Sequence, residues 1–272
     1  MNSILKRNNV LVIGDAEESI MFAHGFGCDQ NVWRHLIEAF RSDYKIILFD
    51  YVGAGKSDLS AYNAEKYATL NGYAQDVLDI CKALNLKSSI FVGHSVSSMV
   101  GVRAALLQLE LFSQLIFVTP SPSYINDGDY YGGMEKDDIE GLLEIMDNNY
   151  LGWSSTMAPL VMGNADRPEL GEELTENFCS TNPDIAKQFA RVTFLSDSRG
   201  DLDKLTVPSL TLQCSNDMLA PLSVGTYIKQ HALGNTLTVL NATGHCPHLS
   251  SPQETIDAIR FYLSAQKAEK EL

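Results

Sequence analysis

Long apolar runs are missing from this sequence of 272 residues. Its apolar runs, such as 46–49 and 115–118, contain only a few residues, whereas a membrane-spanning helix needs about 20. The first residues do not lead into the apolar segment and small-residue cleavage site of a secretory signal. The sequence therefore predicts no transmembrane helix, and we expect the protein in the cytoplasm.

A surplus of basic residues is also missing. The chain has 20 Lys and Arg against 34 Asp and Glu, which gives a formal net charge of −14. Nucleic acids and anionic membranes are bound by basic surfaces that displace counterions. We expect neither as a partner, and we interpret the acidic balance as serving solubility.

Paired cysteines are the third absence. The five cysteines are odd in number and scattered, with no C-x-x-C pair. This pattern predicts reduced thiols rather than a disulfide framework or a redox site. His245 and His248 are close in sequence, but no third ligand with suitable spacing accompanies them. We therefore expect no metal and no cofactor.

Short β-branched and apolar runs alternate with amphipathic stretches, the pattern of an α/β protein with a mostly parallel sheet flanked by helices. The expected strands are 10–13, 19–23, 45–49, 89–92, 115–119, 209–214 and 236–240. The expected helices of this alternation are 72–84, 96–107, 222–231 and 253–265.

The alternation stops between Pro120 and about Leu205. This segment has helical patterning over 136–148, 152–161, 169–178 and 183–194, with Gly, Pro, Asn or Asp between the helices. Residues on both sides of it belong to one predicted sheet. We therefore predict a single domain whose core is 1–119 and 206–272, with 120–205 inserted as a helical cap.

The strongest motif is Gly93-His94-Ser95-Val96-Ser97, between a predicted strand and a predicted helix. A tight turn in this context lifts a serine hydroxyl above the sheet, as in the nucleophile elbow of the α/β-hydrolase fold. The usual pattern ends in glycine, and here Ser97 takes that position. Small residues are needed because the backbone is crowded there. We predict Ser95 as the nucleophile of a serine hydrolase.

A serine hydroxyl needs a base that removes its proton and an acid that orients the base. In this fold the order along the chain is Ser, then Asp or Glu, then His, with each residue following a strand. Asp217 follows the predicted strand 209–214, and His245 follows 236–240. We predict Ser95, Asp217 and His245 as the catalytic residues.

Other residues compete for these two roles. His248 lies three residues after His245, and Asp197, Asp201 and Asp203 lie before the sixth predicted strand. An isolated Asp or His is more often a solvated or core side chain than a catalytic one. The required chain order and the placement after a strand favour Asp217 and His245 over them.

Acyl transfer also needs backbone N–H donors for the developing oxyanion. The turn His24-Gly25-Phe26-Gly27 follows the second predicted strand, so we predict the N–H groups of Phe26 and Val96 as this pair. Without the elbow, the turn would be an ordinary glycine turn. Gly53-Ala54-Gly55-Lys56 is no nucleotide site, since a Walker motif needs four residues between its first Gly and the Gly-Lys pair.

The predicted cap is rich in aromatic and thioether side chains. Most such residues at helical spacing pack the core, but some are expected to line an apolar pocket over Ser95. The predicted pocket residues are His94, Tyr124, Met134, Trp153, Met157 and Phe194. Such a pocket favours a small hydrophobic substrate over a polymer or a charged metabolite.

Several segments resemble the RsbQ-type bacterial stress regulators and their plant relatives, the karrikin and strigolactone receptors. These segments are 26–33 (FGCDQNVW), 48–55 (LFDYVGAG), 91–97 (FVGHSVS), 120–122 (PSP) and 244–248 (GHCPH). The regions around Cys28, Tyr51 and Cys246 look more like RsbQ. The elbow looks more like the plant receptors, which also carry serine where most hydrolases carry glycine.

The resemblance implies a hydrolase with a V-shaped cap of four helices, the same triad and the same oxyanion donors. It further implies slow hydrolysis of a small hydrophobic ester or lactone, used to sense that ligand and read by a protein partner at the cap. For an RsbQ-like member the partner is a PAS-domain phosphatase of the stress response. A purely catabolic carboxylesterase or lactonase without a partner is the alternative.

Overall fold

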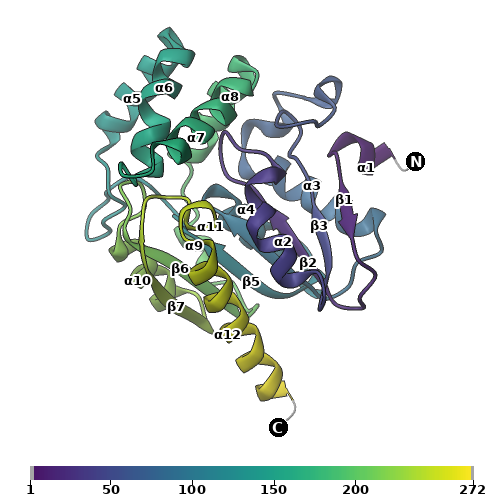
Figure 1. The fold of residues 1–272 in the computed structure, drawn as a ribbon. Helices are drawn as coiled ribbons and strands as arrows, with labels where there is room; N and C mark the ends of the chain where they lie inside the picture. Colours follow the sequence, from purple (N-terminus) through teal and green to yellow (C-terminus); the bar gives the residue numbers. More distant parts are fainter. Residues whose placement is uncertain (1–2, 271–272) are drawn as a thin grey trace.

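The computed structural model describes residues 3–270 and contains a seven-stranded sheet (Figure 1). The strands are β1 (Leu11–Ile13), β2 (Ser19–Ala23), β3 (Lys45–Leu48), β4 (Ser89–His94), β5 (Phe112–Val118), β6 (Ser209–Asn216) and β7 (Asn235–Thr243). Their order across the sheet is β1-β3-β2-β4-β5-β6-β7. Only β1 is antiparallel to its neighbour, so the predicted mostly parallel sheet is confirmed.

All seven predicted strands are present, with corrections at three end residues: Val10 lies outside β1, Phe49 lies outside β3, and Thr119 lies outside β5. Thr119 was predicted as a strand residue, but β5 ends at Val118. The φ angle of Thr119 is +49°, a left-handed value that a strand cannot contain. The hydroxyl of Thr119 reaches the carbonyl of His245 at 2.8 Å, a tertiary contact that the β propensity of threonine does not reveal.

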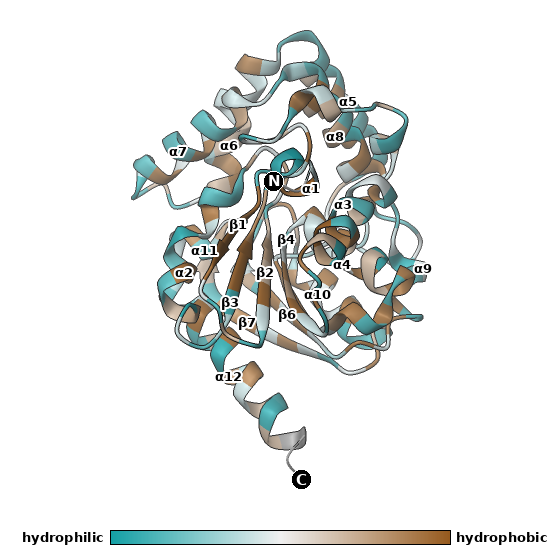
Figure 2. Ribbon diagram, turned by 90° about the vertical axis from the view of Figure 1, so that its right-hand side faces the viewer, coloured by the Kyte–Doolittle hydropathy of each residue, from teal (hydrophilic) through white to brown (hydrophobic). Residues whose placement is uncertain are grey.

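Helices cover both faces of the sheet. One face carries α3 (Leu70–Ala83), α4 (Val96–Leu107) and α10 (Leu222–His231), and the other carries α2 (Arg34–Phe40), α11 (Pro247–Ser250) and α12 (Pro252–Lys270), as Figures 1 and 2 show. The helices α1 (Ser3–Arg7), α2, α9 (Arg199–Leu202) and α11 were not predicted. Each has seven residues or fewer, too short for a helical period to stand out.

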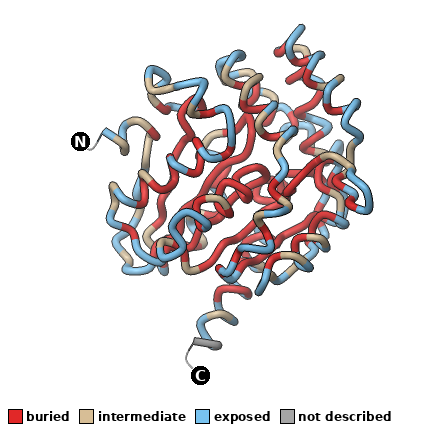
Figure 3. Tube along the Cα trace, turned by 180° about the vertical axis from the view of Figure 1, so that it is seen from behind, coloured by how far each residue is buried: buried red, intermediate tan, exposed pale blue. Residues whose placement is uncertain are grey.

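The central strands are buried on both sides. Every residue of β2 and β4 is buried, because helices cover both faces of a parallel sheet (Figure 3). Short 3-10 helices occupy the connections at Gln30–Trp33, Leu59–Ala61, Lys66–Ala68 and Leu109–Leu111. Among residues 3–270, no helix combines the length and apolarity that a membrane crossing requires.

Of the helices between β5 and β6, the first four gather above the carboxyl ends of the strands (Figure 1). They are α5 (Lys136–Asn148), α6 (Tyr150–Met162), α7 (Pro168–Ser180) and α8 (Pro183–Leu195), and we call them the cap. Asn149 and Asn182 cap α6 and α8 by accepting backbone N–H groups, and prolines begin α7 and α8. The same Asn and Pro residues marked the helix boundaries in the sequence.

Candidate active site

Ser95 lies in a strained turn between β4 and α4. Its backbone has φ 55° and ψ −124°, a region that residues other than glycine rarely adopt. Gly93 allows the turn, because a Cβ there would lie 2.6 Å from backbone atoms of Ser97. The N–H of Ser95 donates to the carbonyl of Val118 over 2.8 Å. This geometry is a nucleophile elbow at the carboxyl end of a central strand.

The structure brings Asp217 and His245 to Ser95 from two neighbouring strands. Asp217 follows β6 and His245 follows β7, so both lie at the same edge of the sheet. The distance from Ser95 Oγ to His245 Nε2 is 2.7 Å, and that from His245 Nδ1 to Asp217 Oδ2 is also 2.7 Å. The other carboxyl oxygen, Oδ1, accepts the N–H groups of Leu219 and Ala220 at 2.9 and 3.3 Å.

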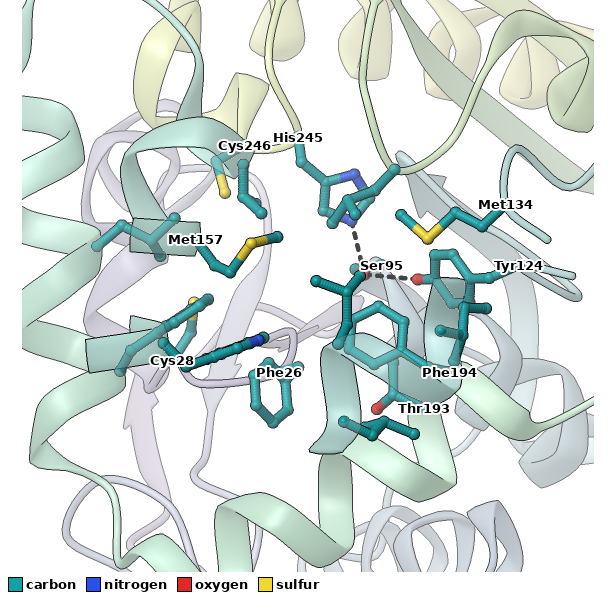
Figure 4. Close-up of a pocket in the computed structure, with 18 of the residues that line it drawn as sticks. Phe26, Cys28, Ser95, Tyr124, Met134, Met157, Thr193, Phe194, His245 and Cys246 are labelled. Carbon is teal, nitrogen blue, oxygen red and sulfur yellow. Dashed lines mark hydrogen bonds between the residues drawn. The ribbon is translucent and has the colours of Figure 1, made fainter. Parts of the chain in front are cut away.

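The contacts of the three side chains determine where the protons lie. A carboxylate only accepts, so His245 Nδ1 carries the proton shared with Asp217, and Nε2 accepts the hydroxyl proton of Ser95. The hydroxyl of Tyr124 lies 3.2 Å from Ser95 Oγ and must donate to it (Figure 4). Burial raises the pKa of Tyr124, which keeps this donor protonated.

The backbone of His245 is held on both sides. Its carbonyl lies 2.8 Å from His94 Nε2 and 2.8 Å from the hydroxyl of Thr119. Burial lowers the pKa of His94 well below its usual value, so the ring is neutral and Nε2 carries the proton that it donates. The N–H of His245 donates to the carbonyl of Val161 at 2.9 Å. Because Val161 belongs to α6, the cap is bonded directly to residues 244–246 between β7 and α11, which we call the histidine loop.

One predicted oxyanion donor, Val96, directly follows Ser95, and the other, Phe26, lies in the segment after β2. Val96 is the first residue of α4, so its N–H has no acceptor within the helix. Phe26 belongs to residues 24–27, which follow β2 and which we call the oxyanion loop. The ring of Phe26 packs against Trp153, Phe178 and Phe194 of the cap.

A mostly apolar cavity lies over Ser95, between the cap and the sheet (Figure 4). Phe26 and all six predicted pocket residues line it: His94, Tyr124, Met134, Trp153, Met157 and Phe194. The polar lining residues include Ser95, His245 and Tyr124, and also Thr193 and Trp153, whose Oγ1 and Nε1 atoms are buried without a hydrogen-bond partner among residues 3–270. No Asp, Glu, Lys or Arg is among the lining residues that the structure describes, so the cavity suits an uncharged, mostly apolar ligand.

Sequence reasoning missed other lining residues, namely Cys28, Ile139, Leu142, Leu143, Val161, Leu174, Phe178, Thr193, Leu219 and Cys246. Leu142 and Leu143 follow Ile139 by three and four residues, so helical spacing could have placed them on one face. The spacing does not show which face meets the cavity. Cys28 and Cys246 gave no sequence signal, because isolated cysteines more often pack in a core.

The competing residues lie elsewhere. The ring of His248 packs between Trp33 and His94, with centroid distances of 4.5 and 4.4 Å. Burial lowers the pKa of His248 to about 3. The three aspartates bind other side chains: Asp197 binds Arg199, Asp201 binds Arg103, and Asp203 binds His231. No group of three or more His, Cys, Asp or Glu within residues 3–270 has the geometry to hold a metal ion.

Curated relatives match almost the whole chain. Karrikin insensitive 2 receptor IA of Petunia hybrida is 40% identical over 265 residues, which cover 97% of each protein. A strigolactone esterase of Arabidopsis thaliana is 37% identical over 260 residues, covering 95% of this chain and 97% of the relative.

Solved structures of hydrolases and esterases are also similar to this chain. A hydrolase from Oleispira antarctica superposes with a TM-score of 0.94 at 40% identity, covering 96% of each chain. An esterase from Exiguobacterium antarcticum has a TM-score of 0.86 at 21% identity over 94% of each chain, which shows a shared fold. The family model described as the alpha/beta hydrolase family matches residues 20–258. The chain therefore belongs to the alpha/beta hydrolase family.

Proposed function

We propose that this protein is a serine hydrolase that slowly cleaves a small hydrophobic ester or lactone and uses the reaction to sense that ligand. One observation carries the catalytic part: Ser95 Oγ, His245 and Asp217 form a continuous hydrogen-bonded chain with two contacts of 2.7 Å. This arrangement gives a serine hydroxyl the base and the orienting acid that it needs.

In the first step Ser95 Oγ attacks the ester or lactone carbonyl and its proton passes to His245 Nε2. Asp217 fixes the imidazole and stabilises the imidazolium that forms. The carbonyl oxygen gains the negative charge and is bound by the N–H groups of Phe26 and Val96. His245 then protonates the leaving alkoxide, which leaves an acyl group on Ser95. Water, deprotonated by His245, releases the acid and restores Ser95.

The substrate class follows from the cavity. Within residues 3–270, its lining is mostly aromatic, aliphatic and thioether, contains no Asp, Glu, Lys or Arg, and includes Ser95 and His245 among its few polar residues. A small molecule with a single ester or lactone group matches this distribution, and a charged one would lose its hydration without a partner. Ser95 is 5% exposed under the cap. We infer that movement of the cap controls entry and release, which supports slow turnover.

The sensing part is supported by the contact between the cap and His245. The N–H of His245 donates to Val161 O, and Gly244 approaches the same helix so closely that a Cβ would lie 1.8 Å from Met162 O. A ligand on Ser95 touches Trp153 and Met157 of α6, which also line the cavity. The ligand can therefore shift the helix that holds the histidine loop.

Hydrolysis of a p-nitrophenyl ester tests the catalytic part. We expect Ser95→Ala to abolish turnover, and Asp217→Asn to lower kcat by about 10⁴-fold because the imidazole loses its required tautomer. Intact-mass spectrometry after exposure to candidate lactones should show an adduct on the wild type and none on Ser95→Ala. Unchanged hydrolysis by purified Ser95→Ala would disprove a Ser95-dependent reaction.

The relatives named above include receptors, which favours a signalling role in the cytoplasm over a purely catabolic one. A PAS-domain phosphatase is the partner to test, since the sequence also resembles RsbQ. We expect it to bind the wild type when ligand is present and to bind less to Ser95→Ala. High turnover on one metabolite, with no partner recovered with or without ligand, would support the catabolic alternative instead.

A further inference from the structure

Ser97 stands where the elbow pattern normally has glycine, and its hydroxyl is used. The side chain is completely buried in the first turn of α4. Its Oγ donates to the carbonyl of His24 over 2.5 Å, and the hydroxyl of Tyr51 lies 3.0 Å from the same Oγ. Three segments far apart in sequence therefore meet at one serine.

The direction of these bonds follows from proton counting. A serine hydroxyl has one proton, and the carbonyl of His24 can only accept it. Tyr51 must then donate to Ser97 Oγ. Burial raises the pKa of Tyr51, so the phenol keeps its proton. The hydrogen bonds therefore run from the Tyr51 hydroxyl to Ser97 Oγ and from Ser97 Oγ to the carbonyl of His24, and each donor has an acceptor.

Tyr51 also holds His24 from its other side. The N–H of Tyr51 donates to His24 Nε2 over 3.2 Å, and His24 Nδ1 donates to the carbonyl of Gly25 over 2.9 Å. Burial lowers the pKa of His24, which favours the neutral ring that this pattern requires. The backbone and the ring of His24 are thus both fixed at the start of the oxyanion loop.

We propose that Ser97 is a positioning residue that fixes the oxyanion loop to the nucleophile helix and so sets the spacing of the two oxyanion donors. The inference rests on the proposed function. Ser97 directly follows Val96, and His24 lies two residues before Phe26. The Ser97–His24 bond therefore links the backbone next to one donor with the backbone next to the other.

The spacing of these donors matters for the rate. Loss of one oxyanion donor typically lowers kcat by about 10²- to 10³-fold, and catalytic groups must be held within roughly 0.5 Å of their productive positions. Glycine at this position has no side chain that could form such a link. In this chain the serine provides the link as well as the small size that the elbow requires.

Two variants and one matched control test the role. Ser97→Ala removes the link, and Tyr51→Phe removes only the donor to Ser97 while keeping the ring. Ser89→Ala is the control, because Ser89 is also buried and its hydroxyl lies 2.6 Å from that of Ser19. These two serines begin β4 and β2, at the ends of the strands opposite to the elbow and the oxyanion loop. The control loses a comparable buried hydrogen bond far from the oxyanion loop.

The readouts are kcat and KM for p-nitrophenyl butyrate, and the inhibition constant of an alkyl trifluoromethyl ketone. Ser95 Oγ adds to the ketone carbon, the carbonyl electron pair becomes an oxyanion, and the serine proton passes to His245. Binding of this adduct therefore reports on the oxyanion donors. The melting temperature of each variant measures the purely structural effect.

We expect Ser97→Ala to lower kcat by about tenfold, a fraction of the loss of one donor, with KM within about twofold. The inhibition constant should rise by a similar factor, and Tyr51→Phe should show a smaller change in the same direction. Ser89→Ala should lower the melting temperature without changing kcat.

Wild-type kcat and inhibition in folded Ser97→Ala and Tyr51→Phe would overturn the role of Ser97 while leaving the proposed function intact. Equal losses of kcat in Ser97→Ala and Ser89→Ala would also overturn it, since stability alone would then explain them. If Ser95→Ala hydrolyses the ester as fast as the wild type, the proposed function fails and the role of Ser97 fails with it.

Discussion

Thr119 offers the sharpest test of how His245, the proposed catalytic base, is held. Its hydroxyl lies 2.8 Å from the carbonyl of His245 and 2.8 Å from that of Val118. Its φ of +49° is unusual for a β-branched residue and costs on the order of 1–3 kcal/mol. The conformation persists because the surrounding contacts hold it, and the hydroxyl is part of those contacts.

Thr119→Val is the informative change. Valine has the same shape and the same branching, so the backbone strain is unchanged and only the hydroxyl is lost. Loss of one partner of a buried hydrogen bond costs about 1–3 kcal/mol of folding free energy. In a chain of this size each kcal/mol lowers the melting temperature by roughly 2–4 °C. We expect a moderate loss of stability in a protein that still folds.

The effect on activity should exceed what stability explains. After the change, His94 alone holds the carbonyl of His245, and the imidazole can rotate away from Ser95. We expect kcat for a p-nitrophenyl ester to fall by about tenfold, a part of the 10²- to 10⁴-fold contribution of a positioned base, with KM nearly unchanged. Thr119→Ser keeps the hydroxyl and should retain kcat.

The assay measures kcat, KM and melting temperature for the wild type, Thr119→Val and Thr119→Ser. A valine variant with lowered melting temperature but wild-type kcat would refute the reasoning, because Thr119 would then act on stability alone. A serine variant as slow as the valine variant would refute it too, since the methyl group rather than the hydroxyl would then be responsible.

Three further predictions follow from the same site. Burial holds the pKa of His248 near 3, below the unfolded value of 6.5, so the neutral ring stabilises the fold above pH 6.5 and this stabilisation is lost as the pH falls toward 3. His248→Phe should therefore make the free energy of unfolding fall less steeply with acid, by about 1.4 kcal/mol per pH unit, in urea unfolding measured between pH 6 and 4. The same slope in the variant and the wild type would contradict this. Gly244→Ala places a Cβ 1.8 Å from Met162 O at a φ of +86°, so it should separate the histidine loop from the cap. Both kcat and the melting temperature should fall, and wild-type values for both would contradict the prediction. Phe194→Ala enlarges the cavity, so the ratio of kcat/KM for p-nitrophenyl octanoate to that for the acetate should rise, and an unchanged ratio would place the acyl chain elsewhere.

The strands of the sheet and the choice of Ser95, Asp217 and His245 could be predicted from the sequence, because both depend on local patterns. Strands β2 and β4 contain continuous apolar runs, and Ser95, Asp217 and His245 each follow one strand of the parallel sheet. The short helices α2 and α11 were missed, since seven or four residues carry too little periodicity.

The support around the three side chains was not predictable. Thr119 lies 126 positions from His245 in the sequence. The two residues come into contact because the backbone after β5 adopts a left-handed conformation at Thr119. Ser97 looked like an imperfect motif residue, and its bond to His24 depends on the packing of β2 against β4. Such contacts depend on tertiary geometry, which neither propensity nor spacing encodes.

His245 contacts both the proposed catalytic residues and the cap. Its ring bonds Ser95 and Asp217, its carbonyl bonds the core, and its N–H bonds Val161 of the cap. A movement of α6 that keeps the Val161 bond must displace the imidazole, and a movement that does not must break a buried hydrogen bond. The free energy of ligand binding at Ser95 therefore differs from one cap position to another. By linkage, a ligand that favours one cap position is bound more tightly in that position, and a partner that binds the same position increases ligand affinity by the same factor. A sensing hydrolase needs this coupling, whereas a catabolic one does not.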